Sequence, residues 1–270
     1  MRFIKSIFDF YLHASIHVAI ATWSLVCLTF HFSHLTFDWI ISSFVFFSTL
    51  LSYNFIKYST ILIKNKSWNR YLTSIFILSL ISIVFCVFLF FLLKPITQFW
   101  ILVFAALTFL YAIPIGKHRL NLRNIAGIKI YIVSICWAGV TLLLPLLNAE
   151  VNLGIDVFYK FLQRFILTLI LILIFEINDL KYDDIRLKTV PQSIGINSTK
   201  KIIYLLCVPF FILEFFKVGI YPNQWLVNLI LVLTIGLFTY FANPNKSKYY
   251  TLFWVEAIPI LWLFLSLLLK

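Results

Sequence analysis

Three acidic residues at helical spacing mark the part of this chain whose side chains could do chemistry. Glu176, Asp179 and Asp183 follow about fifteen mostly apolar residues, in a chain with few other acids. Because a helix turns about 100° per residue, positions i, i+3 and i+7 fall within a narrow arc on one helix face. Magnesium takes one or two carboxylates and completes its octahedron with water or phosphate oxygens. The spacing favours a magnesium site at the end of an apolar helix.

The residues that follow are basic, which suits an anionic ligand bridged to the acids by metal. They are Lys181, Arg186 and Lys188. Two acids separated by three residues form a weak pattern, so a loop that only solvates a helix end is the alternative interpretation. The spacing also leaves open whether Asp183 or its neighbour Asp184 faces the metal.

The composition is that of a polytopic membrane protein with one transmembrane domain, residues 1–270. Hydrophobic residues make up 62% of the chain and charged residues only 12%, whereas soluble domains carry about 25% charged residues. Most basic residues lie in short connections between apolar segments, so the net charge of +12 is read as a topology signal. We therefore expect membrane lipid as a partner and no nucleic acid.

A membrane-spanning helix needs about 20 mainly apolar residues, and nine segments meet this requirement. They are 13–31, 38–58, 72–93, 98–115, 125–147, 157–177, 200–217, 224–241 and 250–269. With the N-terminus in the cytoplasm, seventeen of the 22 basic residues fall on the cytoplasmic side. The sequence thus predicts an all-α bundle of nine helices in the cytoplasmic (inner) membrane, with the acidic stretch on its cytoplasmic face.

Ionisable residues inside apolar segments by default face a cavity or one another. Lys129 could reach an anion held by the acidic stretch, or its ammonium could extend to the membrane interface. Arg164, Glu214 and Glu256 would serve a small transporter, but the sequence has no internal repeat or paired broken helices of the kind that transporters use.

The acidic stretch and its surroundings resemble the UbiA superfamily of intramembrane prenyltransferases. Asp179-Leu180-Lys181-Tyr182-Asp183, followed by Arg186, Lys188-Thr189-Val190-Pro191 and Gly195, is similar to the second Asp-rich motif of that family and its tail. Tyr111-Ala112-Ile113-Pro114 with Lys117 resembles a Tyr-Pro-Lys stretch after the fourth helix, with different spacing. Nine helices with the motif between the sixth and seventh extend the resemblance over essentially the whole chain.

The resemblance implies a Mg²⁺-dependent transfer of a polyprenyl group from its diphosphate to a lipophilic acceptor inside the membrane. Asp179 and Asp183 would be the catalytic metal ligands, with Glu176 as a third. Lys117, Arg186 and Lys188 would contact the diphosphate. Metal and cationic side chains would stabilise the leaving group, and aromatic faces would stabilise the allylic cation.

The first Asp-rich motif of the family, expected between the second and third helices, is degenerate here. Asn54 retains the asparagine, but Phe55 and Tyr58 stand where aspartates would be, and no acid occurs from Ile40 to Asn148. Asn54 and Lys57 would then contact the substrate, with the ammonium of Lys57 neutralising diphosphate in place of one metal. The alternative is a catalytically inactive relative that binds isoprenoid lipid or scaffolds membrane enzymes.

Overall fold

The structure is a computed structural model that describes residues 2–63, 70–112, 127–184, 187–218 and 223–269. All regular elements in these residues are helices. The first half of the chain forms α1 (Arg2–His13), α2 (Ile16–Phe32), α3 (Trp39–Ile63), α4 (Arg70–Leu92), α5 (Pro95–Ala112), α6 (Ile128–Ala138), the π-helical turn η2 (Gly139–Leu143) and α7 (Leu144–Asn148).

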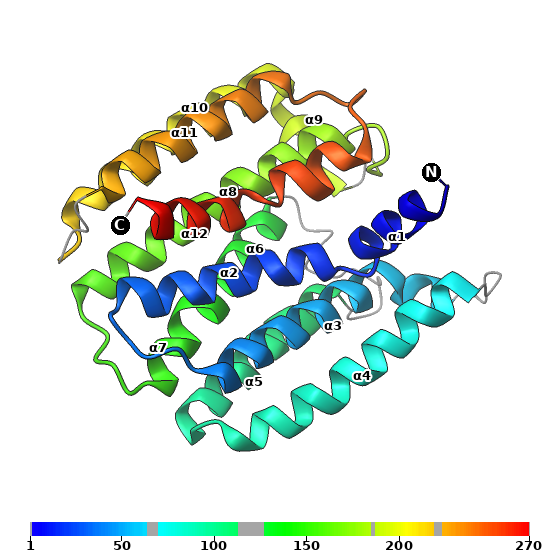
Figure 1. Cartoon of the computed structure of the whole chain (residues 1–270). Helices are drawn as coiled ribbons and strands as arrows, with labels where there is room; N and C mark the ends of the chain where they lie inside the picture. The colour runs from blue at the N-terminus through cyan, green and yellow to red at the C-terminus, as the bar shows by residue number, and fades with distance from the viewer. Residues whose placement is uncertain (1, 64–69, 113–126, 185–186, 219–222, 270) are drawn as a thin grey trace.

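The second half is built around one long helix and ends in two shorter helices. Its elements are α8 (Ile155–Asp179), α9 (Val190–Ile194), α10 (Ile196–Ile212), the 3₁₀ turn η4 (Leu213–Phe216), α11 (Gln224–Phe241), the π-helical segment η5 (Tyr250–Val255) and α12 (Ile258–Leu268). Figure 1 shows the long helices side by side in one bundle, with α1 and α9 at the same end of it.

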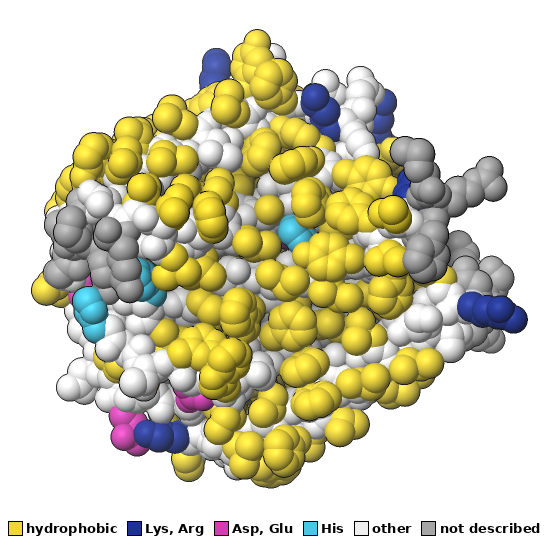
Figure 2. Space-filling model, in the orientation of Figure 1, with side chains coloured by type: hydrophobic (Ala, Val, Ile, Leu, Met, Phe, Trp, Pro, Cys, Tyr) yellow, Lys and Arg dark blue, Asp and Glu magenta, His cyan; other side chains and the backbone are white. Residues whose placement is uncertain are grey.

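Among the described residues, seven helical segments are long and apolar enough to cross a membrane, and a bent pair of helices would make an eighth. On the face shown in Figure 2, hydrophobic side chains cover the middle and most charged side chains lie toward the edges. This is the surface expected of a protein whose middle contacts lipid. The fold class predicted from the sequence, an all-α polytopic membrane protein, is therefore supported.

The predicted number of nine spans is not reached among the described helices. The first predicted segment, 13–31, is broken near its start, because α1 and α2 meet at an angle of 58° next to Ser15, whose backbone is left-handed (φ 62°), and α2 itself has 17 residues. Segment 200–217 becomes α10, whose 17 residues span only about 25 Å at 1.5 Å each. That length is shorter than the roughly 30 Å hydrocarbon core of a bilayer.

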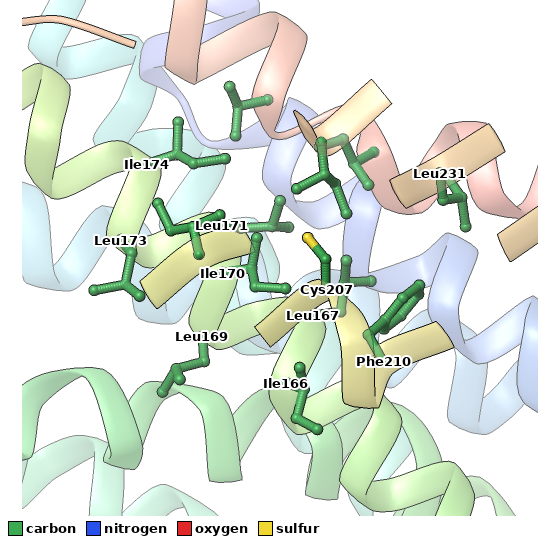
Figure 3. Close-up of a cluster of buried hydrophobic side chains, with 14 of the residues drawn as sticks. Ile166, Leu167, Leu169, Ile170, Leu171, Leu173, Ile174, Cys207, Phe210 and Leu231 are labelled. Atoms are coloured by element: carbon green, nitrogen blue, oxygen red, sulfur yellow. The ribbon is translucent and has the colours of Figure 1, made fainter. Parts of the chain in front are cut away.

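The largest hydrophobic cluster surrounds α8. Leu167, Ile170 and Ile174 on this helix are fully buried, and Phe210 from α10 and Leu231 from α11 pack in the same cluster. Figure 3 shows these side chains converging between the helices. A helix that is apolar on nearly all sides is stable only when it is buried. The position of α8 in the core fixes where its polar C-terminal end, which begins at Glu176, must lie.

A close helix contact elsewhere in the bundle leads to a stability prediction. A Cβ atom added to Gly139 would lie 2.1 Å from Cζ of Phe104, so α5 packs directly on the backbone of η2. We expect Gly139→Ala to lower the free energy of unfolding by roughly 1–3 kcal/mol through overpacking, as measured by thermal unfolding in detergent. Gly236→Ala is the control, because its Cβ would meet nothing nearer than 3.9 Å. Equal stability of the two variants would contradict this packing.

Candidate active site

A cavity of about 370 Å³ lies between α2, α3, α5, α6, α8 and the last membrane-spanning segment. Its wall combines hydroxyl and aromatic side chains with six charged residues. The charged residues are Lys57, Lys129, Glu176, Asp179, Asp183 and Glu256. A cavity among apolar helices that contains both carboxylates and ammonium groups is the arrangement expected of a functional site.

The charged residues gather at one end of the bundle because of where they fall on their helices. Lys57 is near the end of α3, Lys129 is the second residue of α6, and Asp179 is the last residue of α8. Glu256 follows η5, near the start of the last spanning segment. Since successive long helices run in opposite directions, these helix ends meet at the same end of the bundle (Figure 1).

Glu176 is buried and fully engaged by the protein. Its Oε1 lies 3.3 Å from Nζ of Lys129, and its Oε2 accepts a hydrogen bond of 3.1 Å from the backbone N–H of Val190. The carboxylate therefore holds the start of α9 and the side chain of Lys129 beside the end of α8. This arrangement positions Lys129 on the cavity wall.

Asp179 and Asp183 are brought together by one turn of chain beyond the helix. Helix α8 ends at Asp179, and the backbone N–H groups of Tyr182 and Asp183 donate to the Asp179 carbonyl at 2.8 and 3.0 Å. Both carboxylates line the cavity, and Asp179 lies within electrostatic range of Asp183 and Lys129. The common face inferred from the sequence is thus reached by a turn, not by a continuous helix.

The donor set fits a magnesium ion held by two carboxylates and completed by water and phosphate oxygens, which is its usual coordination. It does not form a cage of three protein ligands. Among the described residues, no group of three or more His, Cys, Asp and Glu side chains could hold a metal ion. Both oxygens of Glu176 already bind protein groups, so its assignment as a metal ligand stays a prediction.

The other residues predicted to bind substrate are placed differently. Asn54 is buried between α3 and α4, where its Nδ2 donates to Oγ of Ser79 at 3.2 Å, and it does not line the cavity. Lys188 is exposed and lies outside the cavity wall. Lys117 and Arg186 lie outside the described residues. Of the three predicted contacts that lie in the described residues, Asn54, Lys57 and Lys188, only Lys57 lines the cavity.

Lys57 and Tyr58, in the stretch of the degenerate first motif, fix the bend between α1 and α2. Nζ of Lys57 donates to Oγ of Ser15 at 3.0 Å, and the hydroxyl of Tyr58 donates to the His13 carbonyl at 2.9 Å. Tyr58, which stands where an aspartate would be expected, therefore supports the backbone at the bend. The same contacts orient the ammonium of Lys57 at the cavity wall.

The proximity of Lys57 to Glu256 could not be predicted from the sequence, which indicated only that Glu256 faces a cavity or another ionisable residue, or serves a transporter. The structure puts the two side chains in electrostatic range of each other across the cavity. The only signal in the sequence was an ionisable residue inside an apolar segment. That signal does not name a partner, because the two residues are about 200 positions apart.

Comparison with known proteins adds no relative to this picture. Neither a protein-family model, nor a curated protein, nor a solved structure matches the chain. The functional interpretation rests on the motif around Asp179 and on the cavity that surrounds it.

Proposed function

We propose that this protein is a UbiA-like membrane prenyltransferase, which transfers a polyprenyl group from its diphosphate to a lipophilic acceptor. The observation that carries the proposal is the pair of carboxylates, Asp179 and Asp183, beside Lys129 on the wall of a cavity among apolar helices. A diphosphate bridged to carboxylates by Mg²⁺ needs this combination of charges. An isoprenoid chain needs the apolar remainder of the wall.

Each part of the site has a task in this reaction. Asp179 and Asp183 would hold Mg²⁺, which supplies positive charge to the diphosphate as it leaves. Lys129 adds a fixed ammonium at the same end of the cavity. As the bond between C1 and the diphosphate oxygen breaks, positive charge develops on the allylic carbons, and the rings of Tyr53, Trp137 and Phe175 in the wall would stabilise it.

The setting of the site follows from the distribution of charge in the sequence. Most basic residues fall in connections on the side of the bundle that carries Asp179, and such connections stay in the cytoplasm. We therefore place the N-terminus and the diphosphate end of the cavity in the cytoplasm and the protein in the cytoplasmic membrane. The substrates would enter from that side and from the lipid.

A catalytically inactive relative that binds isoprenoid lipid is the second candidate. It is favoured by the use of Tyr58 as a backbone support and by the position of Asn54 away from the cavity wall, because these two positions of the first motif then do not serve the substrate site. The transporter hypothesis loses support, since Arg164 donates to Thr29 and to Thr141 at the interior of the bundle. Its guanidinium is thereby used in helix packing.

A transfer assay separates the two candidates. Purified protein in nanodiscs would receive radiolabelled farnesyl or geranylgeranyl diphosphate, Mg²⁺ and a lipid extract of the expression host as the source of acceptors. The proposal predicts a labelled lipophilic product and an equal amount of released pyrophosphate, both abolished by EDTA. Mg²⁺-dependent binding of the donor without either product in the presence of this extract would favour the inactive relative.

The structure also distinguishes two neighbouring aspartates that the sequence left as alternatives. Asp183 lines the cavity, whereas Asp184 is exposed and does not. We expect Asp183→Asn to weaken Mg²⁺-dependent binding of farnesyl thiodiphosphate by about ten- to a hundredfold, since one of two anionic metal ligands is lost. Asp184→Asn is the matched control and should bind within about twofold of wild type. A larger loss of binding in Asp184→Asn than in Asp183→Asn would show that Asp183 is not the metal ligand of this turn.

A further inference from the structure

The cavity contains a second centre of charge that the proposed diphosphate site does not use. The charges that act on Asp179 are those of Asp183, Lys129 and Glu176, which lie on α6, at the end of α8 and in the turn that follows α8. The charged group in range of Glu256 is Lys57, and Glu256 is likewise the charged group in range of Lys57. One cavity therefore has two separate polar centres, as an enzyme with two substrates requires.

A hydrogen bond to the protein holds the side chain of Lys57 in place at the second centre. Nζ of Lys57 is hydrogen-bonded to Oγ of Ser15 at 3.0 Å, and Ser15 is fixed at the bend between α1 and α2. Although they attract each other, Lys57 and Glu256 do not form a direct ion pair. Among the described residues, no side chain or backbone group forms a hydrogen bond with the Glu256 carboxylate. An ionised group in such a place is costly unless a ligand or water completes its hydrogen bonds.

The two charges limit what can lie between them. A phosphate would be repelled by Glu256, and an ammonium group would be repelled by Lys57. A ketone or ether oxygen could accept from Lys57 but could not donate to Glu256. A hydroxyl group does both, because it has one donor and two acceptor positions. Beside it, Trp137 donates from Nε1 to the hydroxyl of Tyr53 at 2.9 Å, so aromatic rings are available for an apolar body.

We propose that Lys57 and Glu256 bind the hydroxyl group of the lipophilic acceptor and that Glu256 accepts its proton. This inference rests on the proposed prenyl transfer. The acceptor oxygen forms a bond to C1 of the prenyl group, and the bond from C1 to the diphosphate oxygen breaks with its electron pair. The hydroxyl proton passes to the Glu256 carboxylate, while the ammonium of Lys57 stabilises the developing negative charge on oxygen.

Binding of simple probes tests this assignment without knowledge of the natural acceptor. The probes are 1-decanol and 4-hexylphenol, each compared with its methyl ether, at known mole fractions in nanodiscs. Wild type should bind at least one hydroxyl probe about tenfold or more tightly than its ether, the size expected of hydrogen bonds to charged groups. The preference should fall in Glu256→Gln and vanish, to within about threefold, in Glu256→Leu.

Binding of farnesyl thiodiphosphate with Mg²⁺, measured on the same variants, keeps the inference separate from the proposed function. Asp179→Asn should lose the thiodiphosphate and keep the hydroxyl preference, whereas Glu256→Leu should do the opposite. Equal binding of both hydroxyl probes and their ethers to wild type would overturn the inference, even if thiodiphosphate binds. Loss of thiodiphosphate binding in Glu256→Leu, as large as in Asp179→Asn, would also overturn it by assigning Glu256 to the diphosphate site.

Discussion

Asp179→Asn is expected to weaken Mg²⁺-dependent binding of farnesyl thiodiphosphate on the order of 100-fold or more. The change preserves the shape of the side chain and removes its charge. Asp179 is the last residue of a helix fixed in the core and lies on the cavity wall. Asp183 alone would then have to hold the metal, so the loss should exceed that of any other single substitution in the cavity.

Asp156→Asn provides the matched control for this experiment. Asp156 lies in the first turn of the same helix, at the opposite end of the bundle, and pairs with Lys160 at 2.6 Å. Its replacement should leave thiodiphosphate affinity and Mg²⁺ dependence unchanged. Retention of wild-type binding by Asp179→Asn, or an equal loss in both variants, would show that Asp179 is not a metal ligand.

Lys217→Met is expected to lower the free energy of unfolding by about 3–5 kcal/mol. Nζ of Lys217 lies 2.6 Å from Oε2 of Glu214, and both side chains are almost fully buried. The same oxygen accepts hydrogen bonds from Gln163 and Asn228, so the cluster joins α8, η4 and α11. Removal of the ammonium leaves a buried carboxylate without its opposite charge. Thermal unfolding in detergent would measure the loss.

Two variants test whether burial is the cause of this effect. Lys94→Met breaks the exposed pair of Lys94 with Glu150 and should cost less than about 1 kcal/mol. In the double variant Glu214→Met with Lys217→Met neither charge of this pair remains, so it should be clearly more stable than Lys217→Met alone. A similar loss in Lys94→Met and Lys217→Met would contradict the explanation.

The parts of the fold that depend on local patterns could be predicted from the sequence. The segment 224–241 is α11 with the same bounds, and the segment 157–177 lies within α8. The number of spans could not be predicted, because it depends on two local backbone features. These are the left-handed residue Ser15 between α1 and α2, and the change from α10 to a 3₁₀ turn after Ile212. The apolar composition of these segments indicates neither the left-handed residue nor the 3₁₀ turn.

The candidate site, too, could be predicted only where it depends on residues that are close in the sequence. Glu176, Asp179 and Asp183 are close in sequence, so the sequence placed them together near one helix end, although Asp183 lies in the turn after α8 and not on the helix. The roles of Glu176 and Asn54 depend on residues from other segments, Val190 and Ser79, and hydropathy does not identify such partners. The proximity of Lys57 to Glu256 likewise depends on how distant segments pack together, so the sequence did not indicate it.

The most direct test of the central claim is binding of farnesyl thiodiphosphate to the purified wild-type protein in nanodiscs, with and without Mg²⁺. Binding would be followed by the fluorescence of Trp137 and the other tryptophans, with decyl phosphate as the control for nonspecific anion binding. The proposed function predicts saturable binding that requires Mg²⁺ and is lost with EDTA. Absence of binding under both conditions, or binding that is indifferent to Mg²⁺, would contradict a metal-dependent prenyl diphosphate site at Asp179 and Asp183.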